Sequence, residues 1–158
     1  MAKNTILLKD YSKVYEEYIA GGTITPGMLV ELASTGKVQA HSGAGQNVLP
    51  MIATEDELQG ETIDDNYSAD AQTQCWIPGR GDEGYLILKD GEDVAIGDFL
   101  ESGGDGTVVK HNADGSDATI YSNQIIGVAV EAVDLSASSG AEESGALGYN
   151  KRIMVKFV

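Results

Sequence analysis

Apolar and polar residues alternate along the chain in short segments, and glycine or Asp-Gly pairs separate most of these segments. In the clearest example, Ile153, Val155 and Phe157 fall on one face of a strand, while Met154 and Lys156 fall on the other. Short segments of this kind, punctuated by glycine, are typical of an all-β domain. The strands predicted from this pattern are residues 5–9, 28–32, 37–41, 48–53, 74–78, 84–89, 98–101, 107–111, 118–121, 125–132 and 152–158.

The segments between these strands predict turns, one helical turn and one loop. Residues 54–60 predict a capped single helical turn that ends at glycine. Residues 11–19 fit both a helix and a strand, and we favour extended structure because the segment contains several Tyr and Ile residues. Residues 135–147, rich in Ser, Ala and Gly, predict a flexible surface loop. The Asp-Gly pairs that supply positive φ angles for tight hairpins are Asp90-Gly91, Asp105-Gly106 and Asp114-Gly115.

Two glycine-bounded segments, 21–41 and 91–111, are related by a spacing of 70 residues. In each copy a glycine turn leads into a short strand, a second glycine reverses the chain, and a second strand follows. This period is too long for a solenoid and indicates a two-fold duplication inside one domain, with chance similarity of two hairpins as the alternative. The matching pairs are Gly21/Gly91, Gly27/Gly97, Leu29/Phe99, Glu31/Glu101, Gly36/Gly106, Val38/Val108 and His41/His111.

The composition is strongly acidic, with 25 Asp and Glu against 10 Lys and Arg and a net charge of −15 over 158 residues. A hydrophobic content of 42% predicts a folded chain, and the charge argues against nucleic acid and anionic membranes as partners. The basic residues gather at the ends: residues 1–13 hold three lysines and one aspartate, and residues 149–158 hold three basic residues and no acidic one. These ends would either form one positive patch for an acidic partner or neutralise the protein's own surface.

Residues that could carry catalysis or bind a metal are few or unmarked. Cys75 is the only cysteine, which excludes an intrachain disulfide and a cysteine-rich zinc site. A Cys-His pair would have to use His41 or His111, whose equivalent places in the repeat favour a structural role. Acidic pairs are abundant, but nothing singles out two carboxylates across a cleft. We therefore expect no catalytic residues, no metal site and no cofactor.

Five short motifs follow one another along the chain: ITPGMLVEL at 24–32, LPMIATE at 49–55, LQGETIDDNY at 58–67, IGDFLESGGDGTV at 96–108 and IGVAVEA at 126–132. Each motif is common by itself, but the ordered set resembles the capsid decoration (cement, or head-stabilising) proteins of tailed bacteriophages. The resemblance covers residues 5–158.

This resemblance implies a small β-barrel or β-tulip-like domain with short hairpins and little helix. It implies an extended N-terminal arm at residues 1–13, followed by a single domain at 14–158. The protein would be a non-enzymatic homotrimer that binds the major capsid protein on the outer surface of the mature capsid, at three-fold and quasi-three-fold positions. The capsid-binding arm would contain Lys3, Thr5, Ile6, Leu7, Leu8, Lys9 and Tyr11. The basic patch at the C-terminal end would contain Lys151, Arg152 and Lys156.

Location and two other function classes complete the sequence-based expectations. No apolar run is long enough for a signal-peptide core or a membrane span, so we expect synthesis in the host cytoplasm without export. The first alternative function is a small acidic β-barrel enzyme that uses carboxylate catalysis. The second is a glycan-binding or host-adhesion module on a virion, although Trp76 as the only tryptophan makes a poor stacking platform.

Overall fold

The computed structural model describes residues 3–112, 121, 123–138, 144–145, 148–149 and 151–158. Within these residues the regular structure is almost entirely β, which confirms the all-β prediction. The part of the chain that is described contains no helix long and apolar enough to cross a membrane. The elements are β1 (Leu7–Lys9), β2 (Tyr15–Ile19), β3 (Val30–Leu32), β4 (Val38–Ala40), β5 (Ile52–Ala53), the 3-10 helix η1 (Glu57–Gln59), β6 (Gln72–Trp76), β7 (Glu83–Ile87), β8 (Asp93–Val94), β9 (Phe99–Ser102), β10 (Val108–Lys110), β11 (Gly127–Ala129), β12 (Val133–Asp134), β13 (Ser144–Gly145), β14 (Gly148–Tyr149) and β15 (Arg152–Phe157).

The structure contains both the predicted helical turn and the predicted extended segment. The helix η1 is capped by Asp56, whose side chain accepts a hydrogen bond from the backbone N–H of Gln59, and it ends at Gly60 with φ 78°. The ambiguous segment at residues 11–19 contains the strand β2, as favoured from its composition. Local sequence signals therefore located these two elements correctly.

Antiparallel strands make up all the sheets. The largest has six strands in the order β1-β7-β15-β11-β9-β10, and a second has three strands in the order β2-β6-β5. The pairs β3-β4, β8-β12 and β13-β14 form two-stranded sheets. The described strands thus form several open sheets and no closed barrel, which corrects the barrel expected from the family resemblance.

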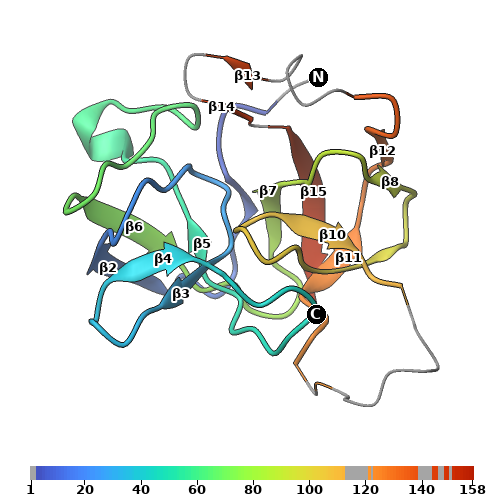
Figure 1. The fold of residues 1–158 in the computed structure, drawn as a ribbon, viewed down its shortest axis with the longest axis horizontal. Helices are drawn as coiled ribbons and strands as arrows, with labels where there is room; N and C mark the ends of the chain where they lie inside the picture. Colours follow the sequence, from blue (N-terminus) through green and yellow to red (C-terminus); the bar gives the residue numbers. More distant parts are fainter. Residues whose placement is uncertain (1–2, 113–120, 122, 139–143, 146–147, 150) are drawn as a thin grey trace.

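The strands after β1 fall into two halves with the same arrangement (Figure 1). In the N-terminal half, residues 15–76, the order β2-β6-β5 continues into β3-β4 through a bridge between Leu29 and Ile52. In the C-terminal half, residues 83–157, the order is β7-β15-β11-β9-β10. The strands β2, β6, β5, β3 and β4 therefore correspond to β7, β15, β11, β9 and β10. Figure 1 shows the N-terminal half at the left and the C-terminal half at the right.

Equivalent strand pairs of the two halves also share their register. The hairpin β9-β10 repeats the residue pairing of β3-β4 at positions 70 residues later. The pair β7-β15 repeats the pairing of β2-β6 with different spacings, because the loops between these strands differ in length. The matched pairs are Glu31–Gln39 with Glu101–Val109, and Glu17–Gln74 with Tyr85–Met154. The structural duplication is therefore wider than the two hairpins visible in the sequence.

Two apolar clusters hold the molecule together. The larger cluster contains residues from both halves, and in it the ring of Trp76 packs edge-on against Phe157, with centroids 5.4 Å apart. The smaller cluster lies within the N-terminal half and includes Ile24, Val38 and Cys75. Because the larger core crosses the junction, the two halves bury apolar surface against each other.

Part of the predicted loop at residues 135–147 is ordered by contacts. Leu135 is buried in the larger core, and Ser144–Gly145 pairs with Gly148–Tyr149. The rest of this prediction, at residues 139–143 and 146–147, lies outside the described residues, as does most of the predicted strand at 118–121.

Candidate functional site

The N-terminal segment, residues 3–11, does not extend away from the domain. It runs between the two halves, where β1 pairs with β7 (Figure 1). Ile6 is 0% exposed and belongs to the larger core. Its backbone N–H donates to the carboxylate of Glu55 at 3.2 Å, and its carbonyl accepts from the backbone N–H of Tyr85 at 2.9 Å. In this structure Ile6 is part of the chain's own core, so it can contact a partner only if the N-terminal segment leaves that core.

The remaining predicted arm residues divide into half-buried and exposed side chains. Leu7 packs against the larger core from its edge. The half-buried residues are Thr5, Leu7 and Leu8, and the exposed residues are Lys3, Lys9 and Tyr11. Only the exposed set is available to a partner without rearrangement of the N-terminal segment.

Asp82 fastens the end of this segment to the turn before β7. Its carboxylate accepts hydrogen bonds from the backbone N–H of Tyr11 at 2.7 Å, the hydroxyl of Ser12 at 2.6 Å and the backbone N–H of Gly79 at 2.8 Å. Burial alone would raise the pKa of Asp82, but these hydrogen bonds outweigh it and lower that pKa. The N-terminal segment is thus held at two points: at Ile6 by the core and Glu55, and at Tyr11 by Asp82.

Glu83 brings the two basic ends of the sequence together. Its carboxylate lies 2.8 Å from the ammonium of Lys9 and 3.0 Å from that of Lys156. The hydrogen bond from Lys9 is the main cause of a lowered pKa at Glu83, and Lys156 adds to it. Of the two alternatives for these basic residues, Lys9 and Lys156 follow the second: they neutralise an acidic group of the same chain.

Arg152, a predicted member of the C-terminal basic patch, is buried at the junction of the halves. Its guanidinium donates to the backbone carbonyl oxygens of Pro26 and Ile63 and lies 3.3 Å from the carboxylate of Asp64. Burial lowers the pKa of Arg152, and the charge of Asp64 opposes that shift. Because Arg152 is only 6% exposed, the predicted three-residue basic patch does not exist as a surface.

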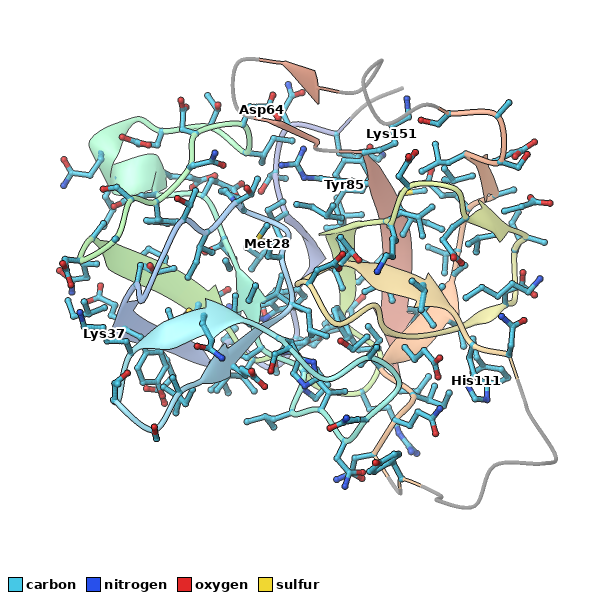
Figure 2. The ribbon with its side chains drawn as sticks, viewed as in Figure 1. Met28, Lys37, Asp64, Tyr85, His111 and Lys151 are labelled. Carbon is cyan, nitrogen blue, oxygen red and sulfur yellow. The ribbon has the colours of Figure 1, made fainter. Side chains whose placement is uncertain are left out.

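An open groove of about 790 Å³ lies beside this arginine. Lys3 and Lys151, from opposite ends of the sequence, both line it, and so do Glu55, Asp64 and Tyr85. Figure 2 shows Asp64, Tyr85 and Lys151 on the same side of the molecule. The groove mixes both signs of charge, and among the described residues no three His, Cys, Asp or Glu side chains are grouped to hold a metal ion.

Of the residues considered for catalysis or stacking, three are buried, and the fourth, His111, is half-buried with its Nδ1 2.6 Å from the carboxylate of Glu101. Cys75 is buried, and burial raises the pKa of its thiol to about 12, so it stays protonated and unreactive at neutral pH. His41 is 4% exposed, with Nδ1 2.8 Å from the hydroxyl of Ser102. Trp76 is 0% exposed and cannot stack on a glycan in this structure.

Apart from Tyr11, the apolar side chains that remain at the surface were not given a functional role from the sequence. Tyr15 and Ile19 on β2 are 51% and 43% exposed, and Ile96 and Phe99 in the C-terminal half are 70% and 51% exposed. No local sequence pattern marks them as exposed, because their equivalents in the other half are buried. They are surfaces that can bind another polypeptide.

No family model and no curated protein matches this sequence. The fold is similar to the crystal structure of the N base of head fiber gp8.5 of bacteriophage phi29, with a TM-score of 0.54 and 15% sequence identity. The match covers 92% of this chain and 93% of that chain. At this identity the likeness shows a shared fold, and its coverage means that the fold shared includes both halves.

Proposed function

We propose that this protein is a non-enzymatic structural component of a bacteriophage particle. It binds the major capsid protein on the outer surface of the mature head, at three-fold and quasi-three-fold positions, as a homotrimer. The observation that carries this proposal is the fold match over nearly the whole chain to a base domain of a phage head fiber. The ordered motifs that resemble capsid decoration proteins point to the same class of protein independently of the fold.

The electrostatics support a binding role over catalysis. A general acid that works near neutral pH needs a carboxyl group whose pKa is raised. Among the described residues, the carboxyl groups with a shifted pKa are all shifted downward by hydrogen bonds and lysines. A body with a net charge of −15 also keeps decorated particles repelling one another in solution.

Capsid stabilisation then follows from preferential binding. A protein that binds the expanded lattice and not the unexpanded one stabilises the expanded form by mass action. Several copies that engage neighbouring capsid subunits together gain avidity. The capsid contacts we assign to the N-terminal segment are its exposed side chains, Lys3 and Tyr11, since Lys9 is engaged by Glu83.

The direct test uses expanded capsids that lack this protein. The purified full-length chain is added, the particles are separated by sedimentation, and bound protein is quantified and located by electron cryomicroscopy. We expect saturable binding with density over three-fold and quasi-three-fold positions, and little binding to unexpanded capsids. Failure to bind expanded capsids at saturating concentration overturns the proposed function.

The contribution of the N-terminal segment is tested by point variants, because deletion would remove Ile6 from the core. Lys3→Glu and Tyr11→Ala are expected to weaken capsid binding by about tenfold together, which corresponds to about 1.4 kcal/mol. Leu58→Ala is the matched control, since Leu58 is an apolar side chain that is 92% exposed elsewhere on the surface. Equal binding of the double variant and the control would show that the segment does not contact the capsid.

A further inference from the structure

The outer edge of β7 is covered where the two halves meet. In β7 every second residue directs its backbone away from β15, and these residues are Glu83, Tyr85 and Ile87. The N–H of Tyr85 donates to the carbonyl of Ile6 at 2.9 Å, and the N–H of Ile87 donates to the carbonyl of Gly27 at 3.0 Å. The backbone groups on this edge are therefore satisfied by other parts of the same chain.

The equivalent edge of β2 is open. Val14 and Ala20 bond across to the β6 side, so the alternating residues Tyr15, Glu17 and Ile19 direct their backbone groups outward. Their N–H groups have no backbone partner among the described residues. The strand β6 pairs with β2 on its other side, and β4 meets only the end of this edge, through a bridge between Ala20 and Val38. We call these three residues the β2 edge. An uncovered edge of this kind is a template for another chain.

The segment that covers β7 also has an uncovered equivalent. Gly27 is packed so closely that an added Cβ would lie 3.1 Å from the carbonyl oxygen of Tyr85. Gly97, its equivalent in the C-terminal half, has the same φ to within a degree and no atom within 4 Å of that position. Residues 96–99, which include the exposed Ile96 and Phe99, thus form a second uncovered surface. We call it the 96–99 segment.

These observations describe one interface whose two sides recur, unpaired, on the surface of the same molecule. Inside the chain, the segment at Gly27 covers the edge of β7. The 96–99 segment is the equivalent of the segment at Gly27, and the β2 edge is the equivalent of the edge of β7. Neither of these two equivalents is covered. We propose that they bind each other between copies of this chain, head to tail, and so repeat the junction between the halves. The proposal deepens the self-association contained in the proposed function by naming the surfaces that form it.

The junction inside the chain predicts the contacts between copies. The carbonyl of Gly97 accepts from the N–H of Ile19 in the next copy, as the carbonyl of Gly27 accepts from Ile87. Gln72 begins β6 as Arg152 begins β15, and it pairs with Ile19 as Arg152 pairs with Ile87. The side-chain amide of Gln72 donates one N–H to the carboxylate of Glu17 and has a second that can donate to the carbonyl of Ile96, in the role that Arg152 has toward Pro26.

The alternative pairing of two β2 edges about a two-fold axis is electrostatically poor. Centred pairing would place Glu17 directly opposite Glu17 of the other copy, and like charges directly opposite destabilise an antiparallel pair. The head-to-tail contact is heterologous, and such contacts form a ring when the rotation from one copy to the next closes after a whole number of copies. The homotrimer of the proposed function is a ring of three such contacts, with six equivalent halves.

The sharpest test exploits the two unlike sides of a heterologous interface. Ile19→Lys disables the β2 edge and leaves the 96–99 segment intact, while Ile96→Lys does the reverse, and the two disabled sides repel each other because both carry a lysine. The full-length proteins are studied by sedimentation velocity across a dilution series, with Leu58→Glu as the control at another exposed apolar side chain. We expect wild type and Leu58→Glu to associate, and each interface variant to associate about tenfold or more weakly.

An equimolar mixture of the two interface variants decides the geometry. Each species retains the side that the other has lost, so the mixture is expected to form a dimer and nothing larger. Hydrogen exchange of wild type should then slow at the amides of Tyr15, Glu17 and Ile19 as the concentration rises. Circular dichroism of all variants should match wild type, because the substituted side chains are exposed.

Three outcomes overturn the inference: monomeric wild type at the highest concentration, self-association unaffected by both variants, or no dimer in the mixture. Capsid binding is measured separately with wild type on expanded capsids. Association without capsid binding would remove the proposed function and keep this interface. If wild type binds capsids but neither substitution weakens self-association, the proposed function stands and this interface is rejected.

Discussion

Equivalent strands in the two halves pair in the same order and register within their own half, but their side chains have very different surroundings. Ile87 in β7 is 1% exposed, and Ile19 at the same place in β2 is 43% exposed. Leu29 is 0% exposed, and its repeat partner Phe99 is 51% exposed. The pairing of a strand is therefore set within its own half, whereas the burial of its side chains depends on whether the other half packs against it.

Polar residues differ between the halves in the same way. Arg152 lies buried at the junction and binds two carbonyl oxygens there, while Gln72 at the equivalent place is exposed. A buried guanidinium without these carbonyl partners and Asp64 would be strongly unfavourable. Arg152 thus lies in the half whose equivalent surface is covered by the other half, and Gln72 lies in the half whose equivalent surface is exposed.

The largest expected effect contrasts Ile87→Ala with Ile19→Ala. Truncating Ile87 should lower the free energy of unfolding by about 2–5 kcal/mol, because this side chain is 1% exposed and its removal leaves a buried cavity. The same change at Ile19 should alter it by roughly 0.5 kcal/mol or less, since that side chain is at the surface. Urea unfolding of dilute protein measures both, and similar losses at the two sites would contradict the difference in burial.

A smaller effect contrasts Gly27→Ala with Gly97→Ala. Both glycines have positive φ, 93° and 92°, so both substitutions strain the backbone by about 1 kcal/mol. Gly27→Ala should cost about 1–3 kcal/mol more, because its Cβ would press on the carbonyl of Tyr85 across the junction. Thermal and urea unfolding of the pair report the difference. Equal destabilisation would mean that the junction is looser than the structure shows.

The smallest effect concerns the ion pairs of Glu83 with Lys9 and Lys156, which are absent at the equivalent Tyr15. Glu83 has a pKa below its ordinary value of 4.5, so its ionised form stabilises the folded state above that pH. Glu83→Gln should lower the free energy of unfolding by about 1 kcal/mol at neutral pH, a value limited by the water around both lysines. The stabilisation is lost as pH falls through the folded-state pKa. Unfolding curves of variant and wild type should therefore converge in acid, and a gap that persists there would reject the ion-pair explanation.

The sequence indicated which residues belong to the candidate site, but it did not indicate which of them are buried. The clustering of lysines at both ends was correct, and Lys9 and Lys156 do meet. The sequence places Ile6 in a capsid-binding arm and not in the core, because a short apolar run near a terminus has the same pattern whether it binds a partner or the chain's own core. Arg152 was read as a surface cation because burial of an arginine depends on carbonyl groups far away in the sequence, at Pro26 and Ile63.

Short-range pattern was sufficient for the all-β class, the helical turn at Asp56 to Gly60 and the repeated hairpins. These features depend on residue alternation and on glycines whose backbone angles are set by neighbours a few positions away. The long-range contacts were decided only in the folded molecule. Ile6 and Gly27 cover β7, whereas among the described residues the outer edge of β2 is met only at its end, by the bridge between Ala20 and Val38. The equivalent strands β2 and β7 have different environments because the two halves pack side by side, so that the edge of β7 faces the other half and the edge of β2 faces outward. No local sequence pattern indicates which of the two edges is covered.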